Sequence, residues 1–331
     1  MTQRYLSTHI FYNVIDARPL LVECVTPLIS TLENEALIDG YFFIRYWLGG
    51  PHIRLRLRLT DGAEELTVKE ILEKAVRSYL ARRPSLFDLD PVKSQPYMRR
   101  LYEAEYGSEA FKEQFGENAS VPIYPNNSIS YIDYQPEYDR YGGPKGVELA
   151  EWHFERSSAT VLRILKTGNC HIKSALLGQG LQLMHAMASV CYPDPSSRAV
   201  FFERYSQAWR EQYLQDNVAP ESMYEKAYDR QRSKLERHIA SLEVYDTAQT
   251  HQSNTVYQWY EHCMALKDAV LALYESGELV LSPLATSSEE AMRRVFVSYM
   301  HMTNNRLGIS IPDESYLAHI LGRTIQEMCE A

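Results

Sequence analysis

A strictly alternating segment, His52 to Leu59 (HIRLRLRL), constrains the fold of this chain more than any other feature. Its basic and apolar residues alternate with the period of two that a β-strand with two different faces requires. The preceding run, Tyr41 to Leu48, is rich in aromatic residues, which favour strands. Gly49–Gly50 between the two runs is typical of a two-residue hairpin turn. The sequence therefore predicts an antiparallel hairpin with one apolar and one basic face.

The basic face of this hairpin has a composition that suits an anion site. A turn at Gly49–Gly50 places Trp47 opposite His52. It also places Arg45 opposite Arg54, and two like charges in that arrangement are easier to explain when an anion lies between them. Arginine binds carboxylate and phosphate groups through two parallel hydrogen bonds. The alternative is that the arginines simply face water, as polar faces of antiparallel strands commonly do. The expected face consists of Tyr41, Phe43, Arg45, Trp47, His52, Arg54, Arg56 and Arg58.

The hydrophobic period changes along the chain, and this change predicts the fold class. Strands are expected at Leu6–Val14 and Ile129–Tyr134, and helices at Arg18–Glu35, Leu66–Ala81 and Tyr97–Tyr106, with a long loop near VPIYPNNS. Beyond Gly146 the period is helical, at Val147–Lys166, His171–Val190, Arg198–Asn217, Glu221–Leu242, Thr255–Glu275, Ser288–Asn304 and Asp313–Cys329. We expect a single α+β domain over residues 1–331. Its α+β portion (1–145) holds a small, mainly antiparallel sheet, and a larger, mainly helical portion (146–331) packs with it.

Composition excludes several classes of protein. The chain has 331 residues and a net charge of −9, so its surface as a whole repels nucleic acid. The N-terminus lacks the apolar core of a signal peptide, and no run of about 18 apolar residues is present to span a bilayer. Five scattered cysteines without CxxC spacing fit a reducing compartment. Motifs of zinc, nucleotide and serine-hydrolase sites are missing. We expect a cytoplasmic protein that contacts neither nucleic acid nor membrane directly.

A polar segment from Gln135 to Pro144 (QPEYDRYGGP) joins the last expected strand to the helical portion. Its Gly-Gly-Pro sequence indicates a tight turn, and Arg140 comes just before that turn. Residues at such junctions often serve sites, because a rigid scaffold carries the loop. The alternative is that Glu137 and Arg140 merely pair with each other.

A histidine near the end of an expected helix is the third feature. The segment Ser298 to Gly308 (SYMHMTNNRLG) closes on Gly308, a common residue at helix C-termini. His301 lies there among apolar neighbours, with Asn305 one turn further on. The negative end of the helix dipole complements a positive imidazole, which suits a general acid or an anion-holding group. The alternative is a core histidine whose hydrogen bonds are satisfied within the protein.

Taken in order, the segments YFFIRYWLGGPHIRLRLRL, QPEYDRYGGP and SYMHMTNNRLG resemble the C-terminal domain of class I lantibiotic dehydratases. That family includes free-standing thiopeptide-type bacteriocin biosynthesis proteins, and the resemblance runs from Tyr5 to the last expected helix. In the full dehydratases, an N-terminal domain glutamylates Ser or Thr of a precursor peptide with glutamyl-tRNA. The C-terminal domain then eliminates glutamate and leaves dehydroalanine or dehydrobutyrine. By motif match, the resemblance implies that the elimination residues are Arg54, Arg56, Arg140 and His301.

The resemblance predicts a stand-alone elimination subunit that works without a metal or cofactor. Because the chain has no large glutamylation domain, we expect its substrate, a ribosomal precursor peptide, to be glutamylated by a separate tRNA-dependent protein. The stretch 97–127 is longer than a minimal elimination domain needs. Further substrate contacts are expected from Arg45, Trp47, His52, Arg58 and Asn305.

Two other functions are compatible with the same sequence. One is a thiopeptide pyridine synthase, which joins two dehydroalanines by a formal (4+2) cycloaddition on the same scaffold. The other is a non-catalytic subunit that grips an acidic leader peptide through the arginine face. The sequence is compatible with a homodimer in each case.

Overall fold

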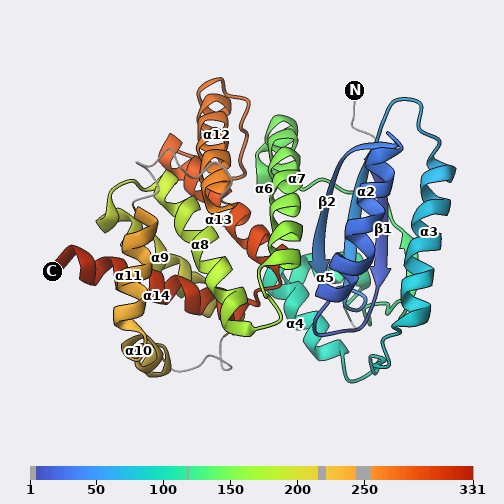
Figure 1. Cartoon of the computed structure of the whole chain (residues 1–331), viewed down its shortest axis with the longest axis horizontal. Coiled ribbons are helices and arrows are strands. Elements are labelled where there is room, and N and C mark those ends of the chain that lie inside the picture. Colours follow the sequence, from blue (N-terminus) through green and yellow to red (C-terminus); the bar gives the residue numbers. More distant parts are fainter. Residues whose placement is uncertain (1–4, 118, 215–220, 244–254, 331) are drawn as a thin grey trace. The chain divides into compact units, whose positions relative to one another are not determined.

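A computed structural model of the chain describes residues 5–117, 119–214, 221–243 and 255–330. The chain forms two compact units, residues 1–135 and 136–331 (Figure 1). The expected α+β class is confirmed, because the protein is 66% helical and has a small four-stranded antiparallel sheet in its N-terminal part. No described helix is both long enough and apolar enough to cross a membrane.

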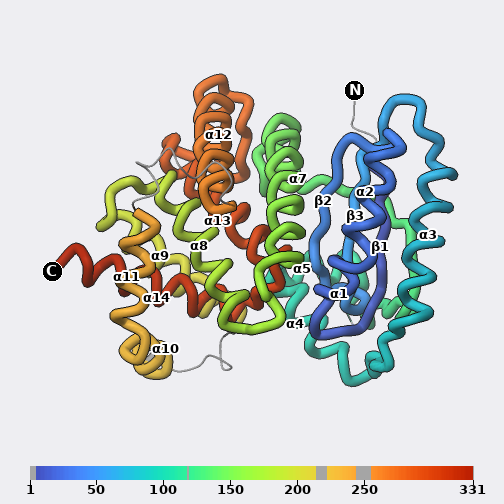
Figure 2. Tube along the Cα trace, viewed as in Figure 1, coloured from blue at the N-terminus to red at the C-terminus, as the bar shows by residue number. Residues whose placement is uncertain are grey.

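Unit 1 is built on the sheet. Its strands are β1 (Tyr5–Phe11), β2 (Ile38–Tyr46), β3 (His52–Leu59) and β4 (Ser128–Tyr131), and its helices are α1 (Arg18–Leu20), α2 (Thr26–Asn34), α3 (Glu65–Arg82), α4 (Gln95–Tyr106) and α5 (Ser108–Phe115). A π-helical turn, Leu21–Val25, joins α1 to α2, so the expected helix from Arg18 is continuous but irregular. The sheet order is β2-β3-β1-β4, and all three pairings are antiparallel. Figure 2 shows β2, β3 and β1 side by side in this order.

The core of unit 1 uses one face of this sheet. The alternate residues Ile53, Leu55, Leu57 and Leu59 are at most 6% exposed, as the period of two predicts. Helices α2 and α3 run alongside the sheet, and each buries one apolar stripe (Figure 1). In α3 this stripe is Val68, Leu72, Val76, Tyr79 and Leu80. One face of β3 is therefore committed to the core, and the other is left for polar groups.

Helix α5 was not predicted, because its sequence reads as part of a polar loop. It is held by a small cluster around Phe111, which is fully buried with Met98, Tyr102 and Val121. Trp47 and Leu48, from the loop after β2, pack against the same cluster. The contacts that stabilise α5 therefore come largely from other parts of the chain rather than from its own amphipathic pattern.

In the described residues of unit 2, all regular secondary structure is helical, and loops join the helices. Its helices are α6 (Tyr138–Tyr141), α7 (Gly143–Thr167), α8 (Lys173–Cys191), α9 (Pro195–Trp209), α10 (Glu221–Asp229), α11 (Arg232–Glu243), α12 (Thr255–Glu275), α13 (Ser288–Leu307) and α14 (Ile311–Glu330). Helix α9 continues into a π-helical turn, Arg210–Leu214, and its expected end at Asn217 lies outside the described residues. Helix α14 packs along α9, while α7, α8, α12 and α13 pack against one another.

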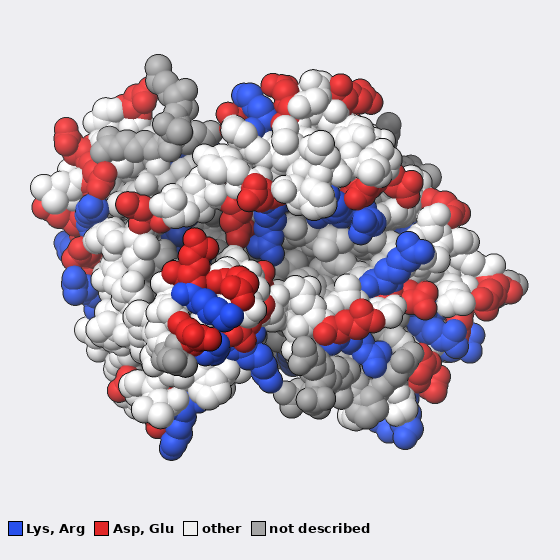
Figure 3. Space-filling view, turned by 180° about the vertical axis from the view of Figure 1, so that it is seen from behind, with Lys and Arg blue, Asp and Glu red and all other residues white. Residues whose placement is uncertain are grey.

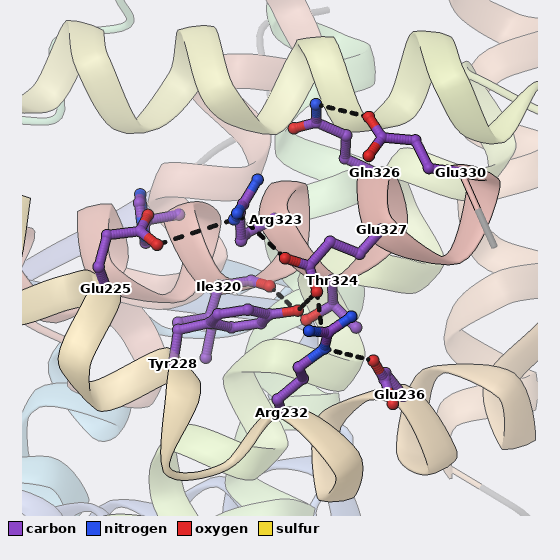
Figure 4. A network of polar contacts seen from close by, with 11 residues as sticks. Glu225, Tyr228, Arg232, Glu236, Ile320, Arg323, Thr324, Gln326, Glu327 and Glu330 are labelled. Atoms are coloured by element: carbon purple, nitrogen blue, oxygen red, sulfur yellow. Dashed lines mark hydrogen bonds and ion pairs between the residues drawn. The ribbon is translucent and has the colours of Figure 1, made fainter.

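The single helix expected over Glu221–Leu242 is wrong, because the chain breaks between α10 and α11. The break allows residues from both helices to reach one carboxylate of α14 (Figure 4). Tyr228 donates its hydroxyl hydrogen to Glu327 at 2.8 Å, and Arg232 pairs with the same carboxylate at 2.8 Å. Arg323, one turn earlier in α14, pairs with Glu327 at 3.1 Å. Helical period alone does not reveal such a break, since both pieces keep their apolar stripe.

Candidate functional site

The polar face of the sheet in unit 1 gathers basic residues from two strands. His52, Arg54, Arg56 and Arg58 alternate along β3 on the face opposite the core, as the sequence predicted. His9 of β1 pairs with Arg54 in the sheet, so its side chain joins this face. Arg56 is 5% exposed, and His9 and His52 are each 4% exposed. The part of the face around His9, His52 and Arg56 is therefore buried, whereas Arg54 and Arg58 are half-buried.

The expected pairing of β2 with β3 is wrong by one residue. Tyr46 lies opposite His52, and Ile44 lies opposite Arg54. Arg45 instead lies opposite Ile53, on the other face from Arg54. A shift by one residue moves every side chain of a strand to the opposite face. The aromatic and aliphatic residues that accompany the arginines are therefore Phe42, Ile44 and Tyr46, in place of Phe43, Arg45 and Trp47.

The loop between the strands explains this shift. The chain turns over Trp47–Pro51 rather than over two glycines, since Gly50 N–H donates to the carbonyl of Trp47 at 3.0 Å. The carbonyl of Gly49 accepts a hydrogen bond from Tyr124 N–H at 2.9 Å, far along the chain. Gly49 has a φ of 80°, and a Cβ there would approach the Tyr124 ring to 2.9 Å. Packing against residues near Tyr124 thus fixes the loop, and the loop fixes the register.

The hydrogen-bond partners of Arg54 and Arg56 are neutral. Arg54 donates from Nε to His52 Nε2 at 3.3 Å, and Arg56 donates from Nη2 to His9 Nε2 at 3.3 Å. His52 can accept there because its Nδ1–H donates to the carbonyl of Gly50 at 2.7 Å. Burial and the nearby arginines lower the pKa of His52 to about 3 and that of His9 to about 2. Both imidazoles are therefore uncharged at neutral pH.

Arg56 is buried and Arg54 is half-buried, and both lack the carboxylate partner that a buried cation usually has. Across the described residues, neither Arg54 nor Arg56 forms an ion pair. Arg54 instead stacks on Tyr46, with its guanidinium carbon 3.5 Å from the ring centroid. Burial, followed by the charge of Arg54, lowers the pKa of Arg56 to about 9, which still leaves it cationic at neutral pH. The face thus has positive charge that the described part of the chain does not neutralise.

The other predicted contacts of the hairpin differ from this pair. Arg58 forms an ion pair with Asp39 at 2.6 Å, at a site where both side chains are partly exposed. Arg45 lies near Asp16, and burial lowers its pKa to about 10. Trp47 belongs to the loop and packs on the small cluster around Phe111. His52 is therefore the only predicted substrate contact of unit 1 that lies directly beside Arg54.

In unit 2, Arg140 lies in the short helix α6. It pairs with Glu137 at 3.2 Å, and both side chains are more than a third exposed. Gly142 ends α6 with a φ of 85°, a conformation that favours glycine. A Cβ at Gly146 would lie 1.7 Å from the carbonyl oxygen of Tyr141, so the turn also needs glycine there. The glycine-rich sequence therefore holds Arg140 at the start of α7.

His301 belongs to α13, and its environment is partly polar rather than purely apolar. Its Nδ1 lies 2.9 Å from the carboxylate of Glu314, a residue with no exposed surface. The Trp209 ring packs on the imidazole, with 4.5 Å between ring centroids. Two residues earlier in α13, Tyr299 stacks on Tyr141, the neighbour of Arg140, at 5.8 Å. The two motifs of unit 2 therefore come from elements that pack on each other. Asn305, also on α13, is half-buried.

Two residues of these sites were not singled out from sequence. His9 lies in the expected strand Leu6–Val14, and its alternation with Ser7 and Phe11 was the available signal. Glu314 had no such signal, because an acidic residue in the first turn of a helix is common.

No group of three or more His, Cys, Asp or Glu side chains in the described residues is placed to hold a metal ion. On the face of the molecule in Figure 3, acidic and basic side chains are interspersed.

These features define an α+β protein with an arginine-bearing antiparallel sheet followed by a helical unit that holds a histidine on a buried carboxylate. The family model for the C-terminal region of lantibiotic biosynthesis dehydratases matches residues 6–325, and the chain belongs to this family. The resemblance seen in the three sequence motifs is thereby confirmed. No curated protein sequence matches the chain.

Three solved structures share the fold of this chain. A pyridine synthase from thiomuracin biosynthesis, TbtD, has a TM-score of 0.79 at 21% identity and covers 98% of each chain. The protein TsrL has a TM-score of 0.71 at 14% identity, over 100% of this chain and 96% of its own. The tRNA-dependent lantibiotic dehydratase MibB from Microbispora sp. 107891 has a TM-score of 0.53 at 16% identity. This match covers 98% of the present chain and 28% of MibB.

Proposed function

We propose that this protein eliminates glutamate from glutamylated Ser or Thr residues of a ribosomal precursor peptide. The observation that carries the proposal is the pair of Arg56, which is buried, and Arg54, which is half-buried. Both donate to neutral imidazoles, and neither forms an ion pair within the described residues. A buried cation of this kind is stabilised when an anion binds beside it. Glutamate offers such an anion, since the glutamyl group carries a free carboxylate and its γ-carboxylate is the leaving group.

The reaction balances as a β-elimination. A base removes the Cα proton of the modified residue, and its electron pair forms the Cα–Cβ double bond. The bond from Cβ to the ester oxygen breaks, and glutamate leaves with both electrons as a carboxylate. Arg54 and Arg56 offset the charge of the leaving carboxylate, and Arg140 offsets charge on the enolate. His301 transfers a proton to or from the reacting group. The products are dehydroalanine or dehydrobutyrine and free glutamate.

The remaining contacts are proposed to bind the peptide. His52 and Arg58 share the face of Arg54 and Arg56. Arg45 and Trp47 belong to the same hairpin, Arg45 on its other face and Trp47 in its loop. Asn305 lies one turn beyond His301 on α13. The peptide is made on the ribosome and is glutamylated by a separate tRNA-dependent protein. Neither a metal nor an organic cofactor is required by this chemistry.

The second candidate is a pyridine synthase. It is favoured by the similarity to TbtD, which covers 98% of each chain, although at 21% identity that similarity shows the fold alone. The third candidate, a peptide-binding subunit without catalysis, rests on the same arginine face. All three candidates bind a peptide on the same scaffold, so the fold does not separate them.

One experiment distinguishes the three functions. The purified chain is incubated with a glutamylated precursor peptide and, separately, with a dehydrated, azole-containing peptide that keeps its leader. Mass spectrometry that shows loss of glutamate from the first peptide supports the elimination. A macrocycle formed from the second peptide, with loss of its leader, overturns elimination in favour of the synthase. Binding of either peptide without any change of mass leaves the binding subunit.

A further inference from the structure

A buried carboxylate in unit 2, Glu314, is held by three side chains from two other helices. It lies in the first turn of α14, where the positive end of the helix dipole stabilises a negative charge. Its Oε1 accepts hydrogen bonds from the Tyr205 hydroxyl of α9 and from Asn304 Nδ2 of α13, the latter at 2.9 Å. Its Oε2 lies 2.9 Å from His301 Nδ1. Each carboxylate oxygen therefore has a distinct set of partners.

The tyrosine in this network keeps its proton. Burial, together with the charge of Glu314, raises the pKa of Tyr205 far above its ordinary value. Tyr205 is thus a donor, and Glu314 accepts from it. Asn304 donates through its amide nitrogen, so both partners of Oε1 are donors. This leaves Oε2 to accept a hydrogen bond from His301.

We infer that Glu314 is a positioning residue, which fixes the tautomer of His301 so that Nε2 is the nitrogen that exchanges a proton with the substrate. A carboxylate can only accept, so Nδ1 carries the hydrogen and Nε2 carries the lone pair. This inference rests on the proposed role of His301 in the elimination. It deepens that role by assigning the reacting atom and the group that holds it in place.

The exposure of the ring agrees with this assignment. The His301 side chain is 22% exposed, whereas that of Glu314 is 0% exposed. Because Nδ1 faces a carboxylate without exposed surface, the exposed part of the imidazole lies on the opposite edge, which carries Nε2. This nitrogen forms no hydrogen bond with the residues that the structure describes. The Trp209 ring, 4.5 Å away between centroids, restricts rotation of the imidazole.

The charge of Glu314 is also available for the imidazolium that forms when Nε2 accepts a proton. In the described part of the chain, no lysine or arginine pairs with Glu314. Glu225, Glu243 and Glu327, also in unit 2, differ because each of them pairs with an arginine. Glu225 contacts His319 at 3.0 Å and Arg323 at 3.7 Å. Glu243 contacts His185 at 3.0 Å but also Arg198 at 2.5 Å. Glu327 contacts Arg232 and Arg323 and has no histidine partner among the described residues. Glu314 thus resembles the carboxylate that orients a catalytic histidine in hydrolytic triads.

The substitution Glu314→Gln tests the inference through the tautomer itself. Tyr205 and Asn304 both donate to the Oε1 position, so they hold the glutamine oxygen there and direct its amide group toward Nδ1. An amide donor at Nδ1 requires the other tautomer, with the hydrogen on Nε2. Long-range nitrogen–proton NMR of the full chain, with the His301 signals identified by comparison with His301→Asn, distinguishes the two forms. We expect the Nδ1–H form in the wild type and the Nε2–H form in the variant.

Kinetics provide the second readout. We expect Glu314→Gln to lower kcat for glutamate release by about 10²–10⁴-fold, the range of proton-transfer catalysis, with little change in KM. Glu327→Gln is the matched control, because it makes the same substitution on α14 at a carboxylate that also accepts from a tyrosine hydroxyl. This control should keep the Nδ1–H form and nearly normal kcat. Glu314→Asp retains a carboxylate, so it should keep the Nδ1–H tautomer and partial activity. If Glu314→Gln does not fold, Glu314→Asp can be tested in its place.

Two outcomes overturn the inference. One is an unchanged Nδ1–H tautomer in Glu314→Gln. The other is a changed tautomer with wild-type kcat, which removes any role for Glu314 in the reaction. A wild-type protein that releases no glutamate contradicts the proposed function instead. In that case the tautomer spectra still decide whether Glu314 orients His301.

Discussion

The polar face of the sheet in unit 1 and the carboxylate network of unit 2 are built on opposite principles. In unit 1, Arg54 and Arg56 donate to neutral histidines and form no ion pair within the described residues. In unit 2, Glu314 accepts from three side chains and has His301 as its one ionisable partner that can become a cation. Under the proposed function, the leaving glutamate supplies an anion to the first arrangement. The second is completed by a positive charge that appears on an imidazole.

The two arrangements hold charge of opposite sign, and the proposed elimination produces charge of both signs. Glutamate departs as an anion, and the removal of a proton creates a cation on the group that accepts it. Each of these charges is stabilised by a group of opposite sign nearby. Substitutions that remove one charged group or one hydrogen-bond partner therefore test each arrangement separately.

In unit 1, the largest effect is expected from Arg56→Ala. Loss of one buried charge that faces the leaving carboxylate should lower kcat/KM for glutamate release by about 10²–10³-fold. The measurement is the rate of glutamate release from a glutamylated peptide, with circular dichroism to show that the fold persists. Arg77→Ala is the control, because Arg77 is an exposed arginine of α3 paired with Glu73 at 2.9 Å. Equal rates for the two variants would contradict the role of Arg56.

The second prediction concerns stability of the carboxylate network. Tyr205→Phe removes a donor from a buried carboxylate and should lower the free energy of unfolding by about 1.5–3 kcal/mol. Urea denaturation followed by tryptophan fluorescence reports mainly on unit 2, which holds Trp152, Trp209 and Trp259. Tyr228→Phe is the matched control, and its effect should be smaller, since Glu327 keeps two arginine partners. A larger loss in the control variant would count against the network at Glu314.

The third prediction is a dependence of unit 1 on pH. The pKa of His9 is about 2 in the folded protein, below its ordinary value of 6.5, so the unfolded chain binds the proton first. Stability is therefore full above pH 6.5 and falls as the pH drops below it, by about 1.4 kcal/mol per pH unit for each such histidine. His9→Gln should remove one such increment. Hydrogen exchange of β1 and β3 amides between pH 7.5 and 5.5 measures the slope. An identical slope in both proteins would show that His9 does not titrate on unfolding.

The two regions also differ in how far the sequence predicted them. The alternation in His52–Leu59 is local to one strand. The sequence therefore correctly predicted the basic and apolar faces of β3 and the burial of the apolar face in the core. The helices of unit 2 followed in the same way from their apolar period, apart from the break between α10 and α11. The register of β2 was not predictable, because the loop Trp47–Pro51 is fixed by Tyr124 and by the cluster around Phe111.

Glu314 shows the limit of sequence reasoning for a site. Tyr205 and Glu314 are 109 positions apart, and only the packing of α9 on α14 brings them together. His301 and Glu314 are 13 positions apart on successive helices, yet neither helix pattern indicates that they meet. Polar residues in a helix are predicted to face water unless a partner is known. The partner is a tertiary contact, so motif matching found the histidine and missed the carboxylate that holds it.

A small effect is expected from Asp39→Asn. This substitution removes the carboxylate that pairs with Arg58 and so increases the net positive charge of the arginine face. Asp39 pairs with Arg58 at 2.6 Å, and it is the carboxylate that sets this arginine apart from Arg54 and Arg56. Both side chains are partly exposed, so loss of the pair should change the free energy of unfolding by less than about 1 kcal/mol.

The same substitution should affect substrate binding. Removal of one negative charge near the face should lower KM for a glutamylated peptide by about twofold. This decrease in KM should disappear at high salt, because exposed charges are screened. Steady-state kinetics at two salt concentrations measure it, with Glu73→Gln, which removes a carboxylate from an exposed pair on α3, as the control. A raised KM in Asp39→Asn would mean that the ion pair holds Arg58 in the position from which it contacts the substrate, rather than neutralising it.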